Sequence, residues 1–525
     1  MQNKRWIERN HKYTLVDGET GFSISFAGMK FEDSDLEKMA PRFERAAKQM
    51  TELEAGAVKN PDENRKVTHF SDRIEYPKSE LFTAVEDFAE AVRSSRVEGA
   101  GGKFESVVIN GIGGSALGPQ LMQFAINGPF WNELTEQLRS DNPKIYFLDN
   151  TDPAGFADVA EVIDPATTLV VTISKSGGTQ ETRNNMIAFE SLYAETDLDF
   201  SSHAVAITMK DSQLWKHAEE KQWLQVFEMA ESIGGRTSET SIVGHLPAAL
   251  AGIDFAAFLE GACHMDQWTR CSNAVRNPAY MLAAMWYIAG SGKGDRNMVI
   301  VPYADRLVLL SRYFQQLVME SLGKELDLDG NVVHQGLNVF GNKGGTDAHA
   351  FIQQLNDGRD DFFITFIEVL KDDVILPIDD STSMGTYLHG FKEGLSAALR
   401  SKGRQVIDIR IDEICEYSLG MIIALYERAV AVYAEFININ AFHQPGVQAY
   451  KLAARSILEL REKMLDKVIE MDGFSGTAAA LSAEIGMADD EIEIGGLLDK
   501  AAINCPDEIV SREYDAEKGW VYTIK

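Results

Sequence analysis

A run of hydroxyls, two glycines and one lysine, from Ser174 to Thr179, separates a β-rich apolar segment (168–173) from a helix-forming segment (184–195). This order predicts a turn from a buried strand into a helix. Glycines let backbone N–H groups approach a ligand, and a helix N-terminus supplies unpaired N–H donors and a positive dipole end. Such a stretch could bind a phosphate dianion through the polar side chains of Ser174, Lys175, Ser176 and Thr179. The alternative is an ordinary turn with capping hydroxyls, and this stretch alone does not decide between the two.

A second glycine-rich turn, residues 110–118, follows another β-rich segment and places Ser115 near a helix start. The turn suits a phosphate or a sugar hydroxyl. A dinucleotide-binding fingerprint is the competing interpretation, but Ala116 occupies the position of its third glycine. The nearest acid at a strand end, Asp149, also lies well beyond the expected spacing of about 20 residues. We therefore place the nucleotide hypothesis lower.

Three further stretches carry groups for acid–base or charge chemistry. Arg236 follows Gly234 and Gly235, where the backbone is closely approachable, although most arginines are simply solvated. Glu320 ends an apolar helical segment, and an apolar setting raises a carboxylate pKa toward the range of a general base. His349 follows a Gly-rich turn and could transfer protons near neutral pH, although a lone histidine is more often structural.

The last stretch, residues 440–451, places Gln444 in a turn and Lys451 on the next helix. A helical lysine is usually a surface residue, but the apolar and amide-rich context is unusual. The ten histidines show no metal-binding spacing, and no nucleophile elbow is present, so we expect neither a metal nor a serine nucleophile.

The elements that must position these groups alternate between strands and helices. We predict two α/β units, at residues 61–270 and 271–460, each a parallel sheet flanked by helices. Residues 1–60 are predicted to form a helical N-terminal extension. Residues 461–525 are predicted to form helices and a hairpin that starts near residue 509, similar to a small winged-helix module. This tail is acidic, which favours a packing role over DNA binding.

Composition restricts the partners. The chain has 525 residues and a net charge of −30, which disfavours nucleic acid as a partner. No segment is apolar enough to predict a membrane span, and the first residues do not resemble a signal peptide. The four cysteines lack paired spacing, as in reduced proteins of the cytoplasm. An anionic metabolite would need local cations to bind against this acidic background.

Taken in chain order, these stretches resemble the glucose-6-phosphate isomerase (phosphoglucose isomerase) family over about residues 65–460. The resemblance implies two sugar-isomerase (SIS-type) domains and a homodimer with a shared active site and no cofactor. It implies the following roles: Glu320 as the base that moves a proton between C1 and C2; His349, from the neighbouring subunit, and Lys451 in ring opening; Arg236 as the cation that stabilises the enediolate; Ser115, Ser174, Lys175, Ser176 and Thr179 at the phosphate; and Gly235, Gln316 and Gln444 as substrate contacts.

The implied reaction is the interconversion of glucose 6-phosphate and fructose 6-phosphate in glycolysis and gluconeogenesis. Gly177 and Gly178 stand where many family members carry bulkier or hydroxyl residues, and Gln448 stands where glutamate is frequent. Three alternatives remain: an isomerase that also accepts mannose 6-phosphate, a non-catalytic sugar-phosphate sensor, and, third, a nucleotide-binding oxidoreductase.

Overall fold

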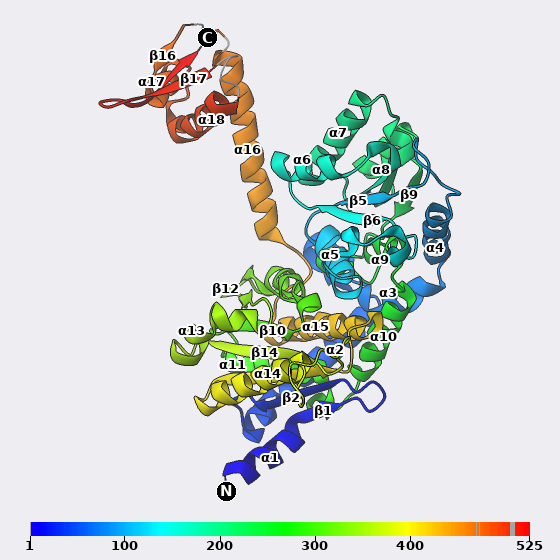
Figure 1. The fold of residues 1–525 in the computed structure, drawn as a ribbon. Helices are drawn as coiled ribbons and strands as arrows, with labels where there is room; N and C mark the ends of the chain where they lie inside the picture. Colours follow the sequence, from blue (N-terminus) through cyan, green and yellow to red (C-terminus); the bar gives the residue numbers. More distant parts are fainter. Residues whose placement is uncertain (1, 469, 472, 505–509, 525) are drawn as a thin grey trace. The chain divides into compact units, whose positions relative to one another are not determined.

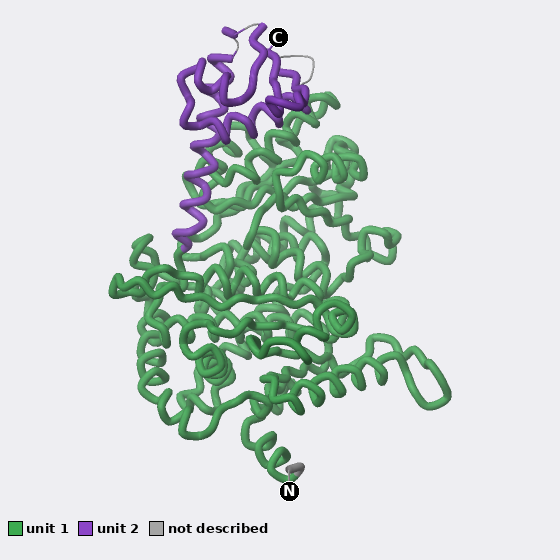
Figure 2. Tube along the Cα trace, turned by 90° about the vertical axis from the view of Figure 1, so that its left-hand side faces the viewer, with its two compact units in different colours: residues 1–443 green, residues 444–525 purple. Residues whose placement is uncertain are grey.

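The computed structural model describes residues 2–468, 470–471, 473–504 and 510–524. The chain divides into two compact parts, Met1–His443 and Gln444–Lys525 (Figure 2). Each part is described by itself. The predicted boundary at residue 460 falls inside helix α16 (Pro445–Val468).

The first sheet of the larger part has five parallel strands in the order β6-β5-β7-β8-β9 (Figure 1). Its strands are β5 (Ser106–Asn110), β6 (Lys144–Leu148), β7 (Thr168–Ile173), β8 (Ala204–Thr208) and β9 (Gln225–Glu228). β5, β7 and β8 are buried along their whole length, which explains their continuous apolar sequence. The sequence did not indicate β9, because its four residues are only partly buried.

Alternate side chains of this sheet enter two different cores. Val108 and Val170 pack with α7 (Gln180–Glu195) and α8 (Gln213–Glu220) on one face. Ile109 and Val171 belong to the main core, which also contains residues of α4 (Glu80–Arg93), α5 (Gly114–Ile126) and α9 (Ile242–Leu250). Helix α6 (Pro153–Val162) follows β6. Helices therefore cover both faces, as predicted.

The second sheet has the order β1-β2-β15-β14-β10-β13. Its parallel strands are β10 (Asn297–Tyr303), β13 (Val339–Phe340), β14 (Phe362–Val369) and β15 (Gln405–Ile411). Two strands come from the N-terminal region: β2 (Ser23–Gly28) pairs antiparallel with β15, and β1 (Thr14–Val16) pairs antiparallel with β2 at the edge of the sheet. Residues 1–60 are thus more than the predicted helical extension: α1 (Gln2–Tyr13) and α2 (Asp33–Glu54) flank a hairpin that completes this sheet.

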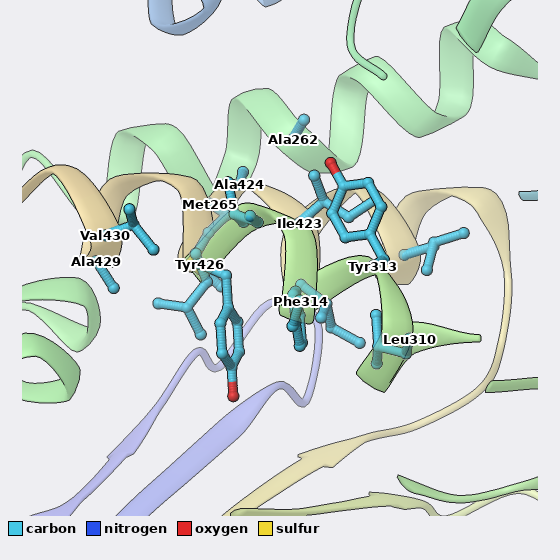
Figure 3. Packing of buried hydrophobic residues seen from close by; sticks show 14 of the residues in the cluster. Ala262, Met265, Leu310, Tyr313, Phe314, Ile423, Ala424, Tyr426, Ala429 and Val430 are labelled. Atoms are coloured by element: carbon cyan, nitrogen blue, oxygen red, sulfur yellow. The ribbon is translucent and has the colours of Figure 1, made fainter. Parts of the chain in front are cut away.

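Helix α15 (Glu416–Ile437) is almost entirely buried and packs against α10 (Phe255–Trp268) and α11 (Pro278–Ala289). α14 (Met384–Ser401) and α13 (Ile352–Asp357) pack on the other face of the second sheet. Tyr426 of α15 stacks on Phe314, the last residue of α12 (Leu310–Phe314), with ring centroids 3.7 Å apart (Figure 3). This contact fixes the end of α12, and the next residue begins the segment that carries Gln316 and Glu320.

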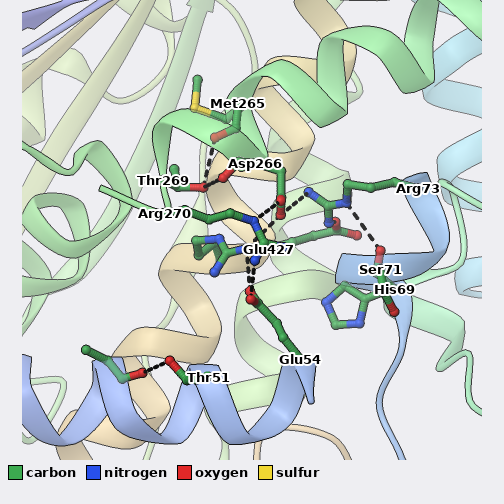
Figure 4. Close-up of polar contacts among 12 residues, drawn as sticks. Thr51, Glu54, His69, Ser71, Arg73, Met265, Asp266, Thr269, Arg270 and Glu427 are labelled. Carbon is green, nitrogen blue, oxygen red and sulfur yellow. Dashed lines mark hydrogen bonds and ion pairs between the residues drawn. The ribbon is translucent and has the colours of Figure 1, made fainter. Parts of the chain in front are cut away.

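A buried ion cluster joins α15 to α10 and α3 (His69–Glu75) (Figure 4). Arg73 donates to Glu427 at 2.6 Å and lies 3.7 Å from Asp266, and all three side chains are fully buried. Arg428 donates to Asp266 at 2.6 Å and pairs with Glu54 at 2.8 Å. Burial raises the pKa of Glu427 to about 7, although the Arg73 guanidinium opposes the shift.

We expect Arg73→Met to lower the free energy of unfolding by about 3–5 kcal/mol, because it leaves Glu427 buried without its cation. Urea unfolding followed by tryptophan fluorescence measures this loss. Lys78→Met is the control, since Lys78 and Glu75 form an exposed pair, and surface pairs contribute little. Equal losses in the two variants would show that the buried cluster does not stabilise the fold.

The smaller part has its own hydrophobic core, which includes Met464, Leu481, Leu498, Val510 and Tyr522. It contains α16, α17 (Ala478–Glu484), α18 (Glu491–Asn504) and a three-stranded sheet. The sheet has the order β16 (Ser475–Gly476), β18 (Gly519–Ile524), β17 (Val510–Asp515). Helices and a hairpin were predicted here. Residue 509, the predicted start of the hairpin, and Cys505 lie outside the described residues.

Candidate active site

Glu320 lies at the end of a π-helical segment, Gln315–Glu320, that continues α12. The sequence predicted a helical segment that ends at Glu320, and its last six residues form this wider turn. Gln316 Nε2 donates to Glu320 Oε2 at 3.0 Å. π-helical turns are rare and are often found at functional sites. The Glu320 side chain is 18% exposed, so it can reach a ligand while remaining largely shielded from water.

Arg236 holds the other oxygen of the same carboxylate, with Nη2 2.9 Å from Glu320 Oε1. Its guanidinium also donates to the carbonyl of Ala441 at 2.8 Å and to that of His443 at 3.3 Å. The side chain is 7% exposed. Burial lowers the pKa of Arg236, and the nearby Glu320 charge opposes this shift. A carboxylate and a fixed cation therefore lie side by side in a shielded place.

The glycine-rich turn 111–115 packs against Gly235 and Gln316, which lie next to these two groups. A Cβ added to Gly114 would lie 1.8 Å from the carbonyl oxygen of Gly235, so only glycine permits this approach. A Cβ on Gly113 would lie 3.0 Å from Gln316 Nε2. Ser115, half-buried, is the second residue of α5. Three stretches that are far apart in sequence thus converge on one place.

The turn 174–179 connects β7 to the N-terminus of α7, as predicted. Ser174 is buried, and its hydroxyl has no partner among the described residues. The Ser176 hydroxyl accepts a bond from the Gly178 N–H at 3.2 Å. Thr179 is the N-cap residue of α7, but its side chain makes no capping bond, so the first N–H groups of the helix stay open to an anion.

Lys175 connects this turn to the loop that precedes Arg236. Its ammonium group donates to the carbonyls of Glu231 at 2.6 Å and Ile233 at 2.7 Å. Burial lowers the pKa of Lys175 to about 8, with Arg65 adding to the shift. In this arrangement Lys175 holds the residues just before Gly234 and Gly235 against the turn 174–179.

Of the remaining predicted residues, His349 belongs to the larger part, and Gln444 and Lys451 belong to the smaller part. His349 is exposed at the end of a 3₁₀ turn, Thr346–His349, and has no hydrogen bond or ion pair among the described residues. Gln444 and Lys451 belong to the smaller part, where both are on or beside the start of α16. Their side chains are therefore described apart from Glu320.

Comparison with known proteins decides the family. The family model "Phosphoglucose isomerase" matches residues 47–395. The chain belongs to this family. It is 45% identical over 521 residues to glucose-6-phosphate isomerase of Geobacter sulfurreducens, covering 96% of each chain. It is 46% identical to the Nostoc punctiforme enzyme over 509 residues, covering 94% of each chain.

A solved structure supports the same assignment for this member of the phosphoglucose isomerase family. The glucose-6-phosphate isomerase of Chlamydia trachomatis superposes with a TM-score of 0.76 and 27% identity, covering 86% of this chain and 91% of that one. The α/β fold with helix-flanked parallel sheets and the isomerase activity, predicted from the motifs, are confirmed. No helix in the described residues is long and apolar enough to cross a membrane.

The sequence did not point to two residues behind this site. Lys324 donates to main-chain carbonyls of the Glu320 segment. Glu239, three residues after Arg236, is fully buried with both carboxyl oxygens unpaired among the described residues, and burial raises its pKa well above the ordinary value. The only sequence signal for Glu239 was a glutamate in a stretch that is buried in the structure. The sequence alone does not show that burial, so the signal is weak.

The sequence also did not predict one group of side chains that could bind a cation. Glu368, His389 and Glu393 place ligand atoms within 4.8 Å of one another. Lys392 lies 3.3 Å from Glu368 and 3.1 Å from Glu393, and Arg410 lies 2.9 Å from Glu368. These side chains already neutralise the carboxylates, so the donor set fits an internal ion network better than a metal ion.

Proposed function

We propose that the interconversion of glucose 6-phosphate and fructose 6-phosphate, the reaction of this family, uses Glu320 as the base in this chain. The observation that supports this role is that Arg236 and Gln316 each contact one oxygen of the Glu320 carboxylate. Such a carboxylate can remove the proton from one carbon and return it to the next. The two contacts hold it beside a cation and in a fixed direction.

Arg236 is proposed to stabilise the enediolate that forms after proton removal. A charge fixed in a shielded site needs no reorganisation when an oxyanion develops beside it, and this term is usually the largest in catalysis. Its main-chain partners, the carbonyls of Ala441 and His443, keep the guanidinium in place while its contact with Glu320 changes. The chemistry thus requires no metal.

The phosphate is proposed to bind between the two glycine-rich turns. Ser115, Ser176 and Thr179 offer hydroxyls, and the unpaired Ser174 hydroxyl adds a donor. The open N–H groups of α7 and the backbone at Gly235 supply further contacts. Lys175 supports the turn 174–179 through its bonds to the carbonyls of Glu231 and Ile233.

Ring opening is proposed to use His349 of a second copy together with Lys451, with Gln444 as a substrate contact, in a homodimer. The exposure of His349 supports this. Exposed apolar side chains in 370–391 also favour a protein partner, because a monomer rarely leaves many such groups in one segment. They are Leu370, Val374, Ile375, Leu376, Ile378, Met384 and Phe391. We also propose a cytoplasmic location, which the free thiols of Cys263, Cys271 and Cys415 support.

Subunit complementation tests the shared site. Glu320→Gln and His349→Gln should each lower turnover of glucose 6-phosphate at least about 100-fold, the smaller end of acid–base contributions. Co-expression of the two variants should restore about a quarter of wild-type activity. Random pairing gives about half heterodimers, and each heterodimer then holds one intact site of two.

The control is a chain that carries both substitutions, co-expressed with either single variant, which forms no intact site. No recovery in the mixed preparation would place His349 and Glu320 in the same subunit. The same coupled assay, run with and without a chelator, tests metal independence. An arm with mannose 6-phosphate decides whether that epimer is also accepted.

A further inference from the structure

Lys324 lies directly behind the proposed base. It begins strand β11 (Lys324–Leu326), two residues after the helical stretch that contains Glu320 ends at Leu322. The residue is 5% exposed. Its ammonium group donates to the carbonyl of Glu320 at 2.8 Å and to that of Ser321 at 2.8 Å.

These two bonds replace the backbone bonds that the end of the helix leaves unmade. The last carbonyls of a helix have no partner within it, and a lysine near the C-terminus can satisfy them. Here the chain turns into a strand, so the side chain of residue 324 takes over this role. The residue of the base is then held from two sides: its carboxylate by Arg236 and Gln316, and its main chain by Lys324.

A buried ammonium is an expensive way to cap a helix. Burying a charge without a directly paired carboxylate costs free energy. An uncharged amide or hydroxyl could donate to these carbonyls at lower cost. Among the described residues, the bonds of Lys324 are the two to carbonyls, and no carboxylate lies within ion-pair distance. Such costly groups tend to occur at functional sites.

We propose that Lys324 is a positioning residue that fixes the main chain of Glu320 and adds a positive charge behind the site. The proposal rests on the proposed role of Glu320 as the base. Lys324 does not touch the reacting atoms. It limits the movement of the peptide from which the carboxylate extends.

The charge of Lys324 is sensitive to pH because of its surroundings. The groups that face it are Arg236, Glu320, Asp62 and His443. Burial, with a smaller contribution from Arg236, lowers the pKa of Lys324 to about 7, while Glu320 and Asp62 oppose the shift. The charged form is therefore present below about pH 7 and is lost as the pH rises through that value. The neutral amine donates more weakly.

The test compares Lys324→Met, Lys324→Gln and Lys324→Arg in the full-length enzyme. In Lys324→Met and Lys324→Gln we expect kcat to fall at least about tenfold, with KM and the inhibition constant of sorbitol 6-phosphate changed less than about threefold. Lys324→Arg should restore part of kcat. Its loss of activity at alkaline pH should shift upward by at least about one unit, because a guanidinium stays charged.

Two controls separate the outcomes. Lys343→Met, which removes a lysine that pairs with the exposed Asp305, should leave all constants unchanged. Glu320→Gln is measured in parallel: if it is active, the base assignment fails. If it is inactive while the Lys324 variants keep wild-type kcat and pH profile, only the positioning role is overturned. A parallel rise in the sorbitol 6-phosphate constant, or an unshifted profile in Lys324→Arg, would also overturn it by indicating general damage to the site.

Discussion

Replacing Glu320 by glutamine should lower kcat by about 10²–10⁴-fold, the range associated with a positioned proton-transfer group. The amide has the same shape, and its oxygen can still accept from Arg236, which now contacts one carboxylate oxygen at 2.9 Å. Its NH2 group would face Gln316, which now donates to the other oxygen at 3.0 Å and would have to turn its own amide oxygen toward that group. It cannot take up a proton from carbon. Affinity for the sugar phosphate should change little, because the proposed phosphate contacts lie on other turns.

The measurement is kcat and KM in the coupled assay, together with the dissociation constant of sorbitol 6-phosphate by calorimetry. Glu325→Gln is the matched control, since Glu325 lies five residues further along the chain and is exposed. This control should behave as wild type. Near-normal turnover in Glu320→Gln would remove Glu320 from the role of base.

The turns of the site could be predicted from sequence because their signals are local. β7 is a continuous apolar strand, and the hydroxyls and glycines after it must stand where the strand meets α7. The same reasoning placed Ser115 after β5. Glycine at 114 could be noticed in sequence, but its reason, the close approach of the Gly235 carbonyl, requires the tertiary structure.

Other features depend on contacts between distant segments. The π-helical turn at Gln315–Glu320 has the same composition as an ordinary helix. Tyr426, which stacks on Phe314 just before this turn, is more than a hundred residues away. β1 and β2 are short, and the pairing of β2 with β15 joins segments from opposite ends of the larger part's sequence. The capping bond of Lys324 arises only because the chain leaves the helix at that point. Periodicity carries no signal for any of these.

Arg236→Met should lower kcat by about 10²–10³-fold, the cost of losing one preorganised oxyanion donor. Arg236→Lys should recover little of this loss. The guanidinium reaches Glu320, Ala441 and His443 at once, and a lysine ammonium lacks the planar fork that these positions require. Arg276→Met, at an exposed arginine, is the matched control. Circular dichroism should show that each variant is folded.

The double variant Glu320→Gln with Arg236→Met separates two explanations of that loss. If Arg236 stabilises the enediolate formed by Glu320, removing both should cost less than the sum of the separate losses, because the two groups act on one step and contact each other. If Arg236 only supports the loop 441–443, the two losses should add. A lysine variant with most of the wild-type kcat would show that charge alone suffices and that the fork of contacts around Arg236 does not govern the rate.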